Sequence, residues 1–183
     1  KGNDEYYKDI MERAIHGEFQ KVDSIKYKDT VKYKTLAGRV VHGGGGIMPD
    51  FFVPADTSGY SDYYSKITQK GLVYQFALDY ADSKRKEFAS FKTSADFENY
   101  FRKVDVLNLF VAFAEKKGIA PKASDLKLSS KIIENQVKAY IARNIIGEKG
   151  FYPIIQNIDK TLLEAIAKSK LPIQQNLTSA VTK

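Results

Sequence analysis

Two patterns of hydrophobic and polar residues divide the chain. From residue 58 onward, apolar residues recur at three- and four-residue spacing, which is typical of helices that pack through one face. Between residues 30 and 53, apolar and polar residues alternate instead, as in Val31, Lys32 and Tyr33, and this is the period of a half-exposed strand. The pattern therefore predicts an α+β protein, with a small N-terminal β segment followed by a mostly α-helical C-terminal domain.

The first 57 residues are predicted to contain one helix and three short strands. The helix begins near Asp4 and ends at Gly17, with His16 as a polar cap at its C-terminus. The strands are predicted over 31–35, over 40–41 after the break at Gly38, and in the FFVP stretch at 51–54.

Residues 58–170 carry the clearest start and stop signals for helices. Short polar side chains that cap helix N-termini precede five of the apolar runs, and glycines end two of the runs. The predicted caps are Ser61, Thr93 or Ser94, Asp105, Ser129 or Ser130, and Asp159, with stops at Gly118 and Gly147. Three segments follow from this pattern: 1–57, a helical domain over 58–170, and a polar tail over 171–183 that has no period and is expected to be loose.

The composition removes several classes of chemistry. Hydrophobic residues make up 43% and charged residues 28% of the chain, which is an ordinary mixture for a globular protein. Since there is no cysteine, disulfides, thiolate nucleophiles and zinc–thiolate sites are excluded, and two histidines give little material for a metal cage. No cofactor and no metal is expected. No apolar stretch reaches the roughly 18 residues of a membrane span, and no targeting signal opens the sequence.

The net charge of +7 is concentrated late in the sequence. Residues 1–60 are neutral, whereas residues 121–183 contain 10 Lys or Arg against 5 Asp or Glu, a net charge of +5. Attraction to nucleic acid or to an acidic protein would therefore depend on the last third. A basic helical binding module is accordingly one functional hypothesis. Tyr60, Tyr63 and Tyr64 could stack on bases in such a module, although packing between helices is the commoner role of such residues.

The run of four glycines at 43–46 has three interpretations. A phosphate loop needs a helix directly after it, but two prolines follow, at positions 49 and 54. An oxyanion loop of the HGGG type needs a G-x-S-x-G nucleophile elbow, which the sequence lacks. Close approach of two backbones is the third and favoured interpretation.

A Ser–Lys dyad is a separate candidate for hydrolase chemistry. The pairs Ser83/Lys86 and Ser124/Lys127 match a dyad spacing but lie in charged surroundings.

The stretch GRVVHGGGGIMPDFFVPADT resembles the end of the catalytic domain in the carboxy-terminal processing peptidases, the tail-specific serine proteases of peptidase family S41. The matching positions are Gly38, Arg39, Gly43, Gly44, Gly45, Gly46, Ile47, Pro49 and Asp50. The following DTSGYSDYYSKITQKGLVYQFALDYAD and the later IIENQVKAYIARNIIGEKGFYPI resemble a subgroup with a long helical extension. The resemblance covers most of residues 1–170.

This resemblance implies a Ser/Lys-dyad endopeptidase that cleaves polypeptides near their C-termini. The family's nucleophilic serine and general-base lysine precede the GGGGI-PD block, so they are expected upstream of Lys1 and this chain alone is expected to be inactive. Residues 1–57 would complete the protease core, with the nine motif positions in a structural role and no catalytic residue among them. The helical domain would support the enzyme or position its substrate. Polypeptide substrates, a homodimer, and the cell envelope or periplasm of a Gram-negative-type bacterium are implied as well, whereas nucleic acid is not.

Overall fold

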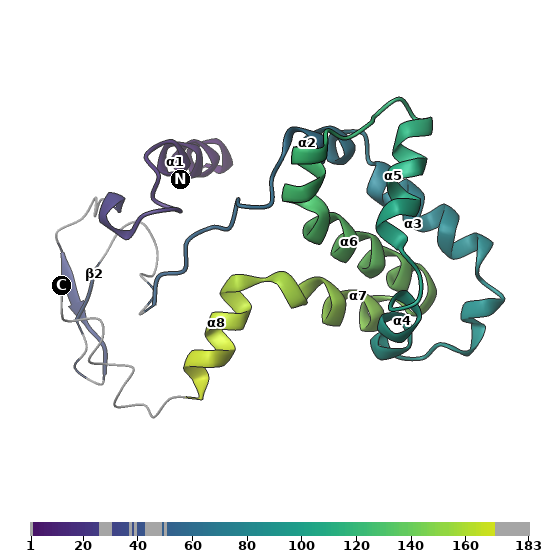
Figure 1. Cartoon of the computed structure of the whole chain (residues 1–183). Helices are drawn as coiled ribbons and strands as arrows, with labels where there is room; N and C mark the ends of the chain where they lie inside the picture. Colours follow the sequence, from purple (N-terminus) through teal and green to yellow (C-terminus); the bar gives the residue numbers. More distant parts are fainter. Residues whose placement is uncertain are drawn as a thin grey trace. The chain divides into compact units, whose positions relative to one another are not determined.

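The computed structural model describes residues 2–25, 31–36, 38, 40–42, 49 and 51–170. The chain divides into two compact units, one formed by residues 1–55 with 164–183 and the other by residues 56–163. Figure 1 shows the helices of the second unit gathered together, in teal and green. The predicted division at residue 58 stays a prediction, and the predicted tail over 171–183 lies outside the described residues.

The second unit, called here the helical unit, is built around one long helix. Helix α6 contacts α2, α3, α4, α5 and α7. The helices are α2 (Asp62–Gln69), α3 (Leu72–Ser83), α4 (Ser94–Phe101), α5 (Val106–Lys116), α6 (Ala123–Ile146), α7 (Glu148–Ile155) and the first residues of α8 (Lys160–Ser169), with 3-10 turns η2 (Glu87–Ser90) and η3 (Gln156–Ile158).

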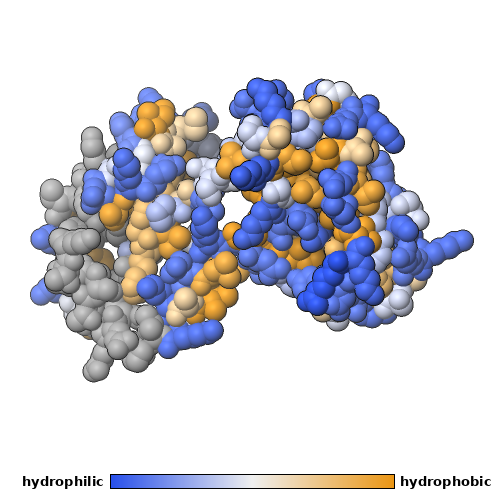
Figure 2. All heavy atoms as spheres, in the orientation of Figure 1, coloured by the Kyte–Doolittle hydropathy of each residue, from blue (hydrophilic) through white to orange (hydrophobic). Residues whose placement is uncertain are grey.

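Large apolar side chains form the core of the helical unit. Phe88, Phe97 and Phe110 are fully buried, as are Ile133 and Val137 of α6. Burial of one such side chain contributes roughly 1.5–3 kcal/mol, so this cluster is the main source of stability for the unit. Figure 2 shows hydrophobic atoms between hydrophilic ones on the viewed face of these helices.

A glycine pair lets α6 and α7 form a tight hairpin. Gly147 ends α6 with φ of +69°, a conformation that residues with a side chain rarely adopt. Gly150 then lies so close to α6 that a Cβ atom there would be 2.9 Å from the Ala142 carbonyl oxygen. The axes of the two helices can therefore approach only because position 150 has no side chain.

The first unit contains α1 (Asn3–Ile15), the 3-10 turn η1 (Val22–Ser24) and an antiparallel hairpin of β1 (Lys32–Lys34) and β2 (Val40–His42). Tyr33 pairs with Val41 at the centre of the hairpin. No residue of α1 is buried, and every residue of β1 is exposed. Glu18 is the buried charged residue here, held by the Arg13 Nε atom at 2.9 Å.

The α+β prediction was wrong. The described residues are mostly helical, with two strands of three residues each, and nothing resembles a β segment that completes a protease core. A strand that joins a core must bury one face, but Tyr33, Val40 and Val41 are exposed. The alternation near Val31 reflects a small surface hairpin, and the FFVP stretch, predicted as a strand, is irregular.

Most helix caps were predicted correctly, because capping is local chemistry. Ser61 accepts a hydrogen bond from the Tyr64 amide, and Asp105 accepts one from the Asn108 amide. Thr93 caps α4, His16 occupies the C-cap of α1, and Asp159 accepts from the Leu162 amide. The predicted cap of α6 at Ser129 or Ser130 was wrong, since α6 begins at Ala123, and α7 was missed because it restarts directly after Gly147.

Candidate functional site

Two of the nine family-motif positions lie in the described part of the chain. Gly38 adopts φ of +80°, and Pro49 is exposed. The other positions, Arg39, Gly43, Gly44, Gly45, Gly46, Ile47 and Asp50, lie outside the described residues. Their predicted role in close backbone packing therefore stays a prediction.

In both Ser–Lys pairs that match a dyad spacing, the serine hydroxyl bonds to a group other than the lysine. The Ser83 hydroxyl donates to the Tyr80 carbonyl oxygen at 2.8 Å, and Ser124 donates to the Asp125 carboxylate at 3.3 Å, both at exposed positions. A serine nucleophile needs its hydroxyl directed at a desolvated base. Neither hydroxyl is so directed, so neither pair is a candidate active site.

The tyrosines considered for base stacking take different places. Tyr63 and Tyr64 are buried in the helical unit, and the Tyr64 hydroxyl accepts a hydrogen bond from Gln136 at 2.8 Å. Tyr60 is 53% exposed, but its ring stacks on Tyr64 at 5.1 Å between centroids. The bond from Gln136 joins α2 to α6, and the Tyr60 stack is local to the start of α2, so these tyrosines have packing roles.

Several cations of the last third are already paired. Lys138 bridges to Glu134, Arg143 to Glu148 at 2.6 Å, and Lys160 to Asp56 at 2.8 Å. The Lys160 ammonium and the Ser58 hydroxyl and amide lower the pKa of Asp56 to about 2. Glu134 and Glu148 are already counted in the net charge of +5, so these pairs do not test the basic-module hypothesis, which stays a prediction.

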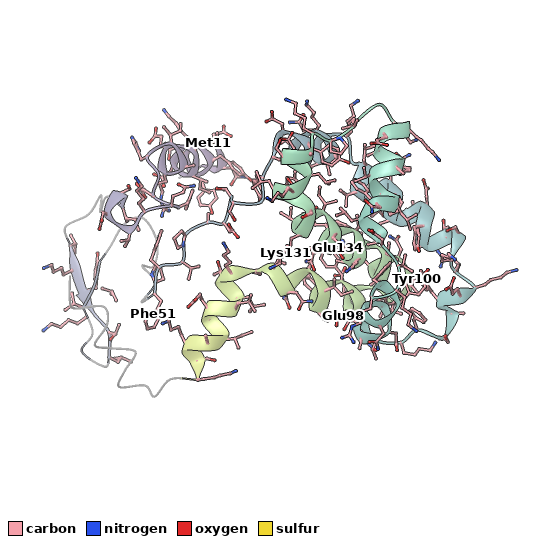
Figure 3. All side chains as sticks on the ribbon, in the orientation of Figure 1. Met11, Phe51, Glu98, Tyr100, Lys131 and Glu134 are labelled. Carbon is pink, nitrogen blue, oxygen red and sulfur yellow. The ribbon has the colours of Figure 1, made fainter. Side chains whose placement is uncertain are left out.

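The best candidate for a binding site is an open pocket of about 470 Å³ at one end of the helical unit. It lies among η2, the turn before α4, one face of α4 and the residues that follow that helix; Figure 3 labels Tyr100 there. Its lining residues are Glu87, Phe91, Asp96, Asn99, Tyr100, Lys103 and Val104. Positions 96, 99 and 100 share one face of α4 by their spacing, and Lys103 and Val104 follow directly after the helix, so one short segment supplies most of the pocket.

Two half-buried aromatic rings form the apolar wall of this pocket. Phe91 and Tyr100 have their ring centroids 6.1 Å apart with planes at 68°. Phe91 also packs edge to face on buried Phe97, and the Tyr100 hydroxyl is 2.9 Å from that of Tyr80. Burial, together with this bond, raises the pKa of Tyr80 above its ordinary value. Both rings are therefore held in position by the core.

Charged groups line the rest of the pocket. The Asp96 carboxylate accepts from the Lys92 amide, the Thr93 amide and the Thr93 hydroxyl, which lower its pKa below the ordinary value and keep it ionised. Glu87 pairs with Lys84 at 2.9 Å in an exposed bridge, and this contact raises the pKa of Lys84. Lys103 is the lining cation. The pocket thus combines aromatic faces with two fixed negative charges and one positive charge.

This pocket was not predicted from the sequence. The signal was present as an acidic, amide, aromatic and basic row at positions 96, 99, 100 and 103, but such a row is normally a solvated helix face. The row becomes part of a pocket only because Phe91, at the C-terminal end of η2, lies beside it.

Metal and membrane chemistry find no support in the described segments. Within those segments, no three acidic or histidine side chains gather into a group that could hold a metal ion. None of the helices described there is both long and apolar enough to cross a bilayer.

The fold and the pocket define a small helical domain with an open surface site. Residues 63–147, from the second residue of α2 to the glycine that ends α6, match the model of a family of unknown function, DUF8443. The matched segment includes every residue that lines the pocket. No curated protein and no solved structure matches the chain.

Proposed function

We propose that this chain is the non-catalytic C-terminal portion of a Ser/Lys endopeptidase of the C-terminal processing family. The observation that carries the proposal is the GRVVHGGGGIMPD block, which resembles the end of that family's catalytic domain. The segments that follow it resemble a helical extension, and the packing of α2, α3, α4, α5 and α7 on α6 supports the proposal.

In this proposal the helical unit has a structural or substrate-positioning role. Its helices pack around a buried aromatic core, which suits a wall that holds a polypeptide. The occupied hydroxyls of Ser83 and Ser124 support the placement of the nucleophile elsewhere. Polypeptides are the substrates of the parent enzyme, which acts in the cell envelope or periplasm and whose subunits can pair as a homodimer.

The test compares this 183-residue chain with the polypeptide extended by the residues encoded upstream of Lys1. The substrate is an unstructured polypeptide with a fluorophore and quencher on either side of a bond near its C-terminus. The extended protein is expected to cleave it and to lose activity when one upstream serine or one upstream lysine is replaced. The chain alone is expected to show no turnover.

Two results would contradict the proposal. One is turnover by the 183-residue chain that disappears in Ser83→Ala or Ser124→Ala. The other is cleavage by the extended protein that persists when each upstream serine and each upstream lysine is replaced in turn. A matched control is Ser130→Ala on the surface of the helical unit, which is expected to leave cleavage by the extended protein unchanged.

A further inference from the structure

We propose that the pocket between η2 and α4 binds an arginine side chain of a polypeptide. The inference rests on the proposed function, in which the helical unit positions a substrate chain, and it names the chemistry of the contact. Its starting point is the lining of the pocket: the Phe91 and Tyr100 rings stand beside the Glu87 and Asp96 carboxylates.

The two rings suit a planar cation. Phe91 and Tyr100 both line the pocket, and aromatic rings attract cations to their faces. Arginine also stacks on aromatic rings better than lysine, since its charge is spread over a flat group that is weakly hydrated. The pocket is open, which suits a side chain that arrives on an extended chain.

The carboxylates supply the charge that selects a cation over a neutral group. The three hydrogen bonds that Asp96 accepts all end on its Oδ2 atom, which leaves Oδ1 as an acceptor. Glu87 is engaged by Lys84, but this bridge is exposed on both sides and weak enough for a guanidinium to compete with it. A guanidinium forks to carboxylate oxygens through two N–H groups.

A substitution at Lys103 distinguishes a cationic ligand from an anionic one. Lys103 is the cation among the lining residues, so replacing it with a neutral residue is expected to strengthen binding of arginine. For an anionic ligand the same replacement must weaken binding. The charge of the true ligand can therefore be read from one exposed substitution that leaves the core untouched.

The experiment titrates the full 183-residue chain with Nα-acetyl-arginine amide and follows the aromatic NMR signals of Phe91 and Tyr100. Nα-acetyl-citrulline amide is the matched probe, because it has nearly the same shape without the charge. The arginine probe is expected to bind in the millimolar range and to shift both rings. The citrulline probe is expected to bind at least about threefold more weakly, the size of an exposed charge contact.

Variants assign the binding to the pocket. Glu87→Gln and Phe91→Leu are each expected to weaken the arginine probe by about two- to fivefold, as for an exposed ion pair or cation–π contact. Asp79→Asn removes an exposed carboxylate on α3, outside the pocket, and is expected to leave binding unchanged. Lys103→Gln is expected to tighten it by about twofold.

Three outcomes would overturn the inference: equal binding of the citrulline probe, weaker binding in Lys103→Gln, or ring shifts unaffected by Glu87→Gln. Since the titration uses the chain without catalysis, its failure is separate from failure of the cleavage test. Binding of arginine by a chain whose extended form cleaves nothing would instead remove the peptidase proposal and keep the pocket.

Discussion

The two compact units differ in what their helices bury. In the helical unit, α6 places six residues in the core and is surrounded by five other helices. In the first unit, α1 buries none, and Tyr7, Met11 and Ile15 are all more than 60% exposed along one side of it; Figure 3 labels Met11.

This contrast shows where the stability of the chain resides. A 13-residue helix is marginal in water by itself, because the cost of nucleation is recovered mainly by packing. The helical unit meets this need within its own residues, whereas the described contacts of α1 do not. Under the proposed function, the apolar side of α1 would be covered by the catalytic body.

The largest difference in stability between the two units is expected from a matched pair of alanine substitutions. Phe97→Ala in the helical unit is expected to cost about 3–5 kcal/mol, because the ring is fully buried and leaves a cavity. Met11→Ala in α1 is expected to cost less than about 0.5 kcal/mol, since its side chain is 63% exposed. Urea unfolding followed by circular dichroism at 222 nm measures both. Equal losses would mean that α1 is packed after all.

The second prediction concerns the close approach of α6 and α7. In Gly150→Ala, the added methyl group meets the Ala142 carbonyl oxygen and Cβ at 2.9 Å and Ile146 at 2.7 Å, so the hairpin must open. Overpacking of this kind is expected to destabilise by about 1–3 kcal/mol, despite alanine's better helix propensity. Thermal unfolding by circular dichroism measures the loss.

Gly59→Ala is the control for this substitution. Its new methyl group would have its nearest neighbour at 3.5 Å, on the Ile132 side chain, which is an ordinary contact. It is therefore expected to change the melting temperature little. A fall in Gly59→Ala as large as that in Gly150→Ala would show that glycine flexibility, and not helix proximity, matters in this unit.

The same contrast explains which structural features could be predicted from the sequence. Caps at Ser61, Thr93 and Asp105 were predictable because each is a bond between neighbours in sequence. The strands over 31–35 and 40–41 were also placed correctly, as β1 and β2, but alternation in a segment this short does not say whether either face meets a core. In that segment the residues of β1 are exposed on both faces.

The pocket was beyond sequence reasoning for a related reason. Its rings are ordinary core aromatics by pattern, and its carboxylates are ordinary surface charges. What brings them together is the irregular turn between η2 and α4, whose path is fixed by the Asp96 bonds to Lys92 and Thr93. Turns of this kind carry no periodicity, so their geometry does not follow from spacing.

The Asp96 capping bonds lead to a prediction about acid. Because its folded pKa is lowered below the ordinary value of 3.8, Asp96 stabilises the helical unit fully above that value. The contribution is lost as the pH falls through the lower folded pKa. The urea midpoint of the wild type is therefore expected to fall from pH 6 to pH 3 by more than that of Asp96→Asn.

The exposed substitution Asp79→Asn, on α3, is the control for the acid series. It is expected to follow the wild type at every pH, because its carboxylate takes no part in a helix cap. If Asp96→Asn kept the full acid sensitivity of the wild type, the capping box would not be what couples the pocket turn to pH.

The smallest expected effect tests how completely the core of the helical unit is satisfied. Tyr63 is 2% exposed, and its hydroxyl finds no hydrogen-bond partner in the described structure. Burial raises the pKa of Tyr63 to about 12, with a further contribution from Glu115. Since an unpaired buried hydroxyl costs desolvation without a return bond, Tyr63→Phe is expected to leave the unfolding free energy unchanged or to raise it by up to about 1 kcal/mol.

Tyr64→Phe is the comparison for this test. It also removes a tyrosine hydroxyl, but one that has a hydrogen-bond partner. Loss of its bond from Gln136 is expected to cost about 1 kcal/mol, so the two variants should move the urea midpoint apart. Destabilisation of Tyr63→Phe by as much as Tyr64→Phe would require a bound water or another acceptor at Tyr63. The core would then contain a polar site that the protein contacts alone do not reveal.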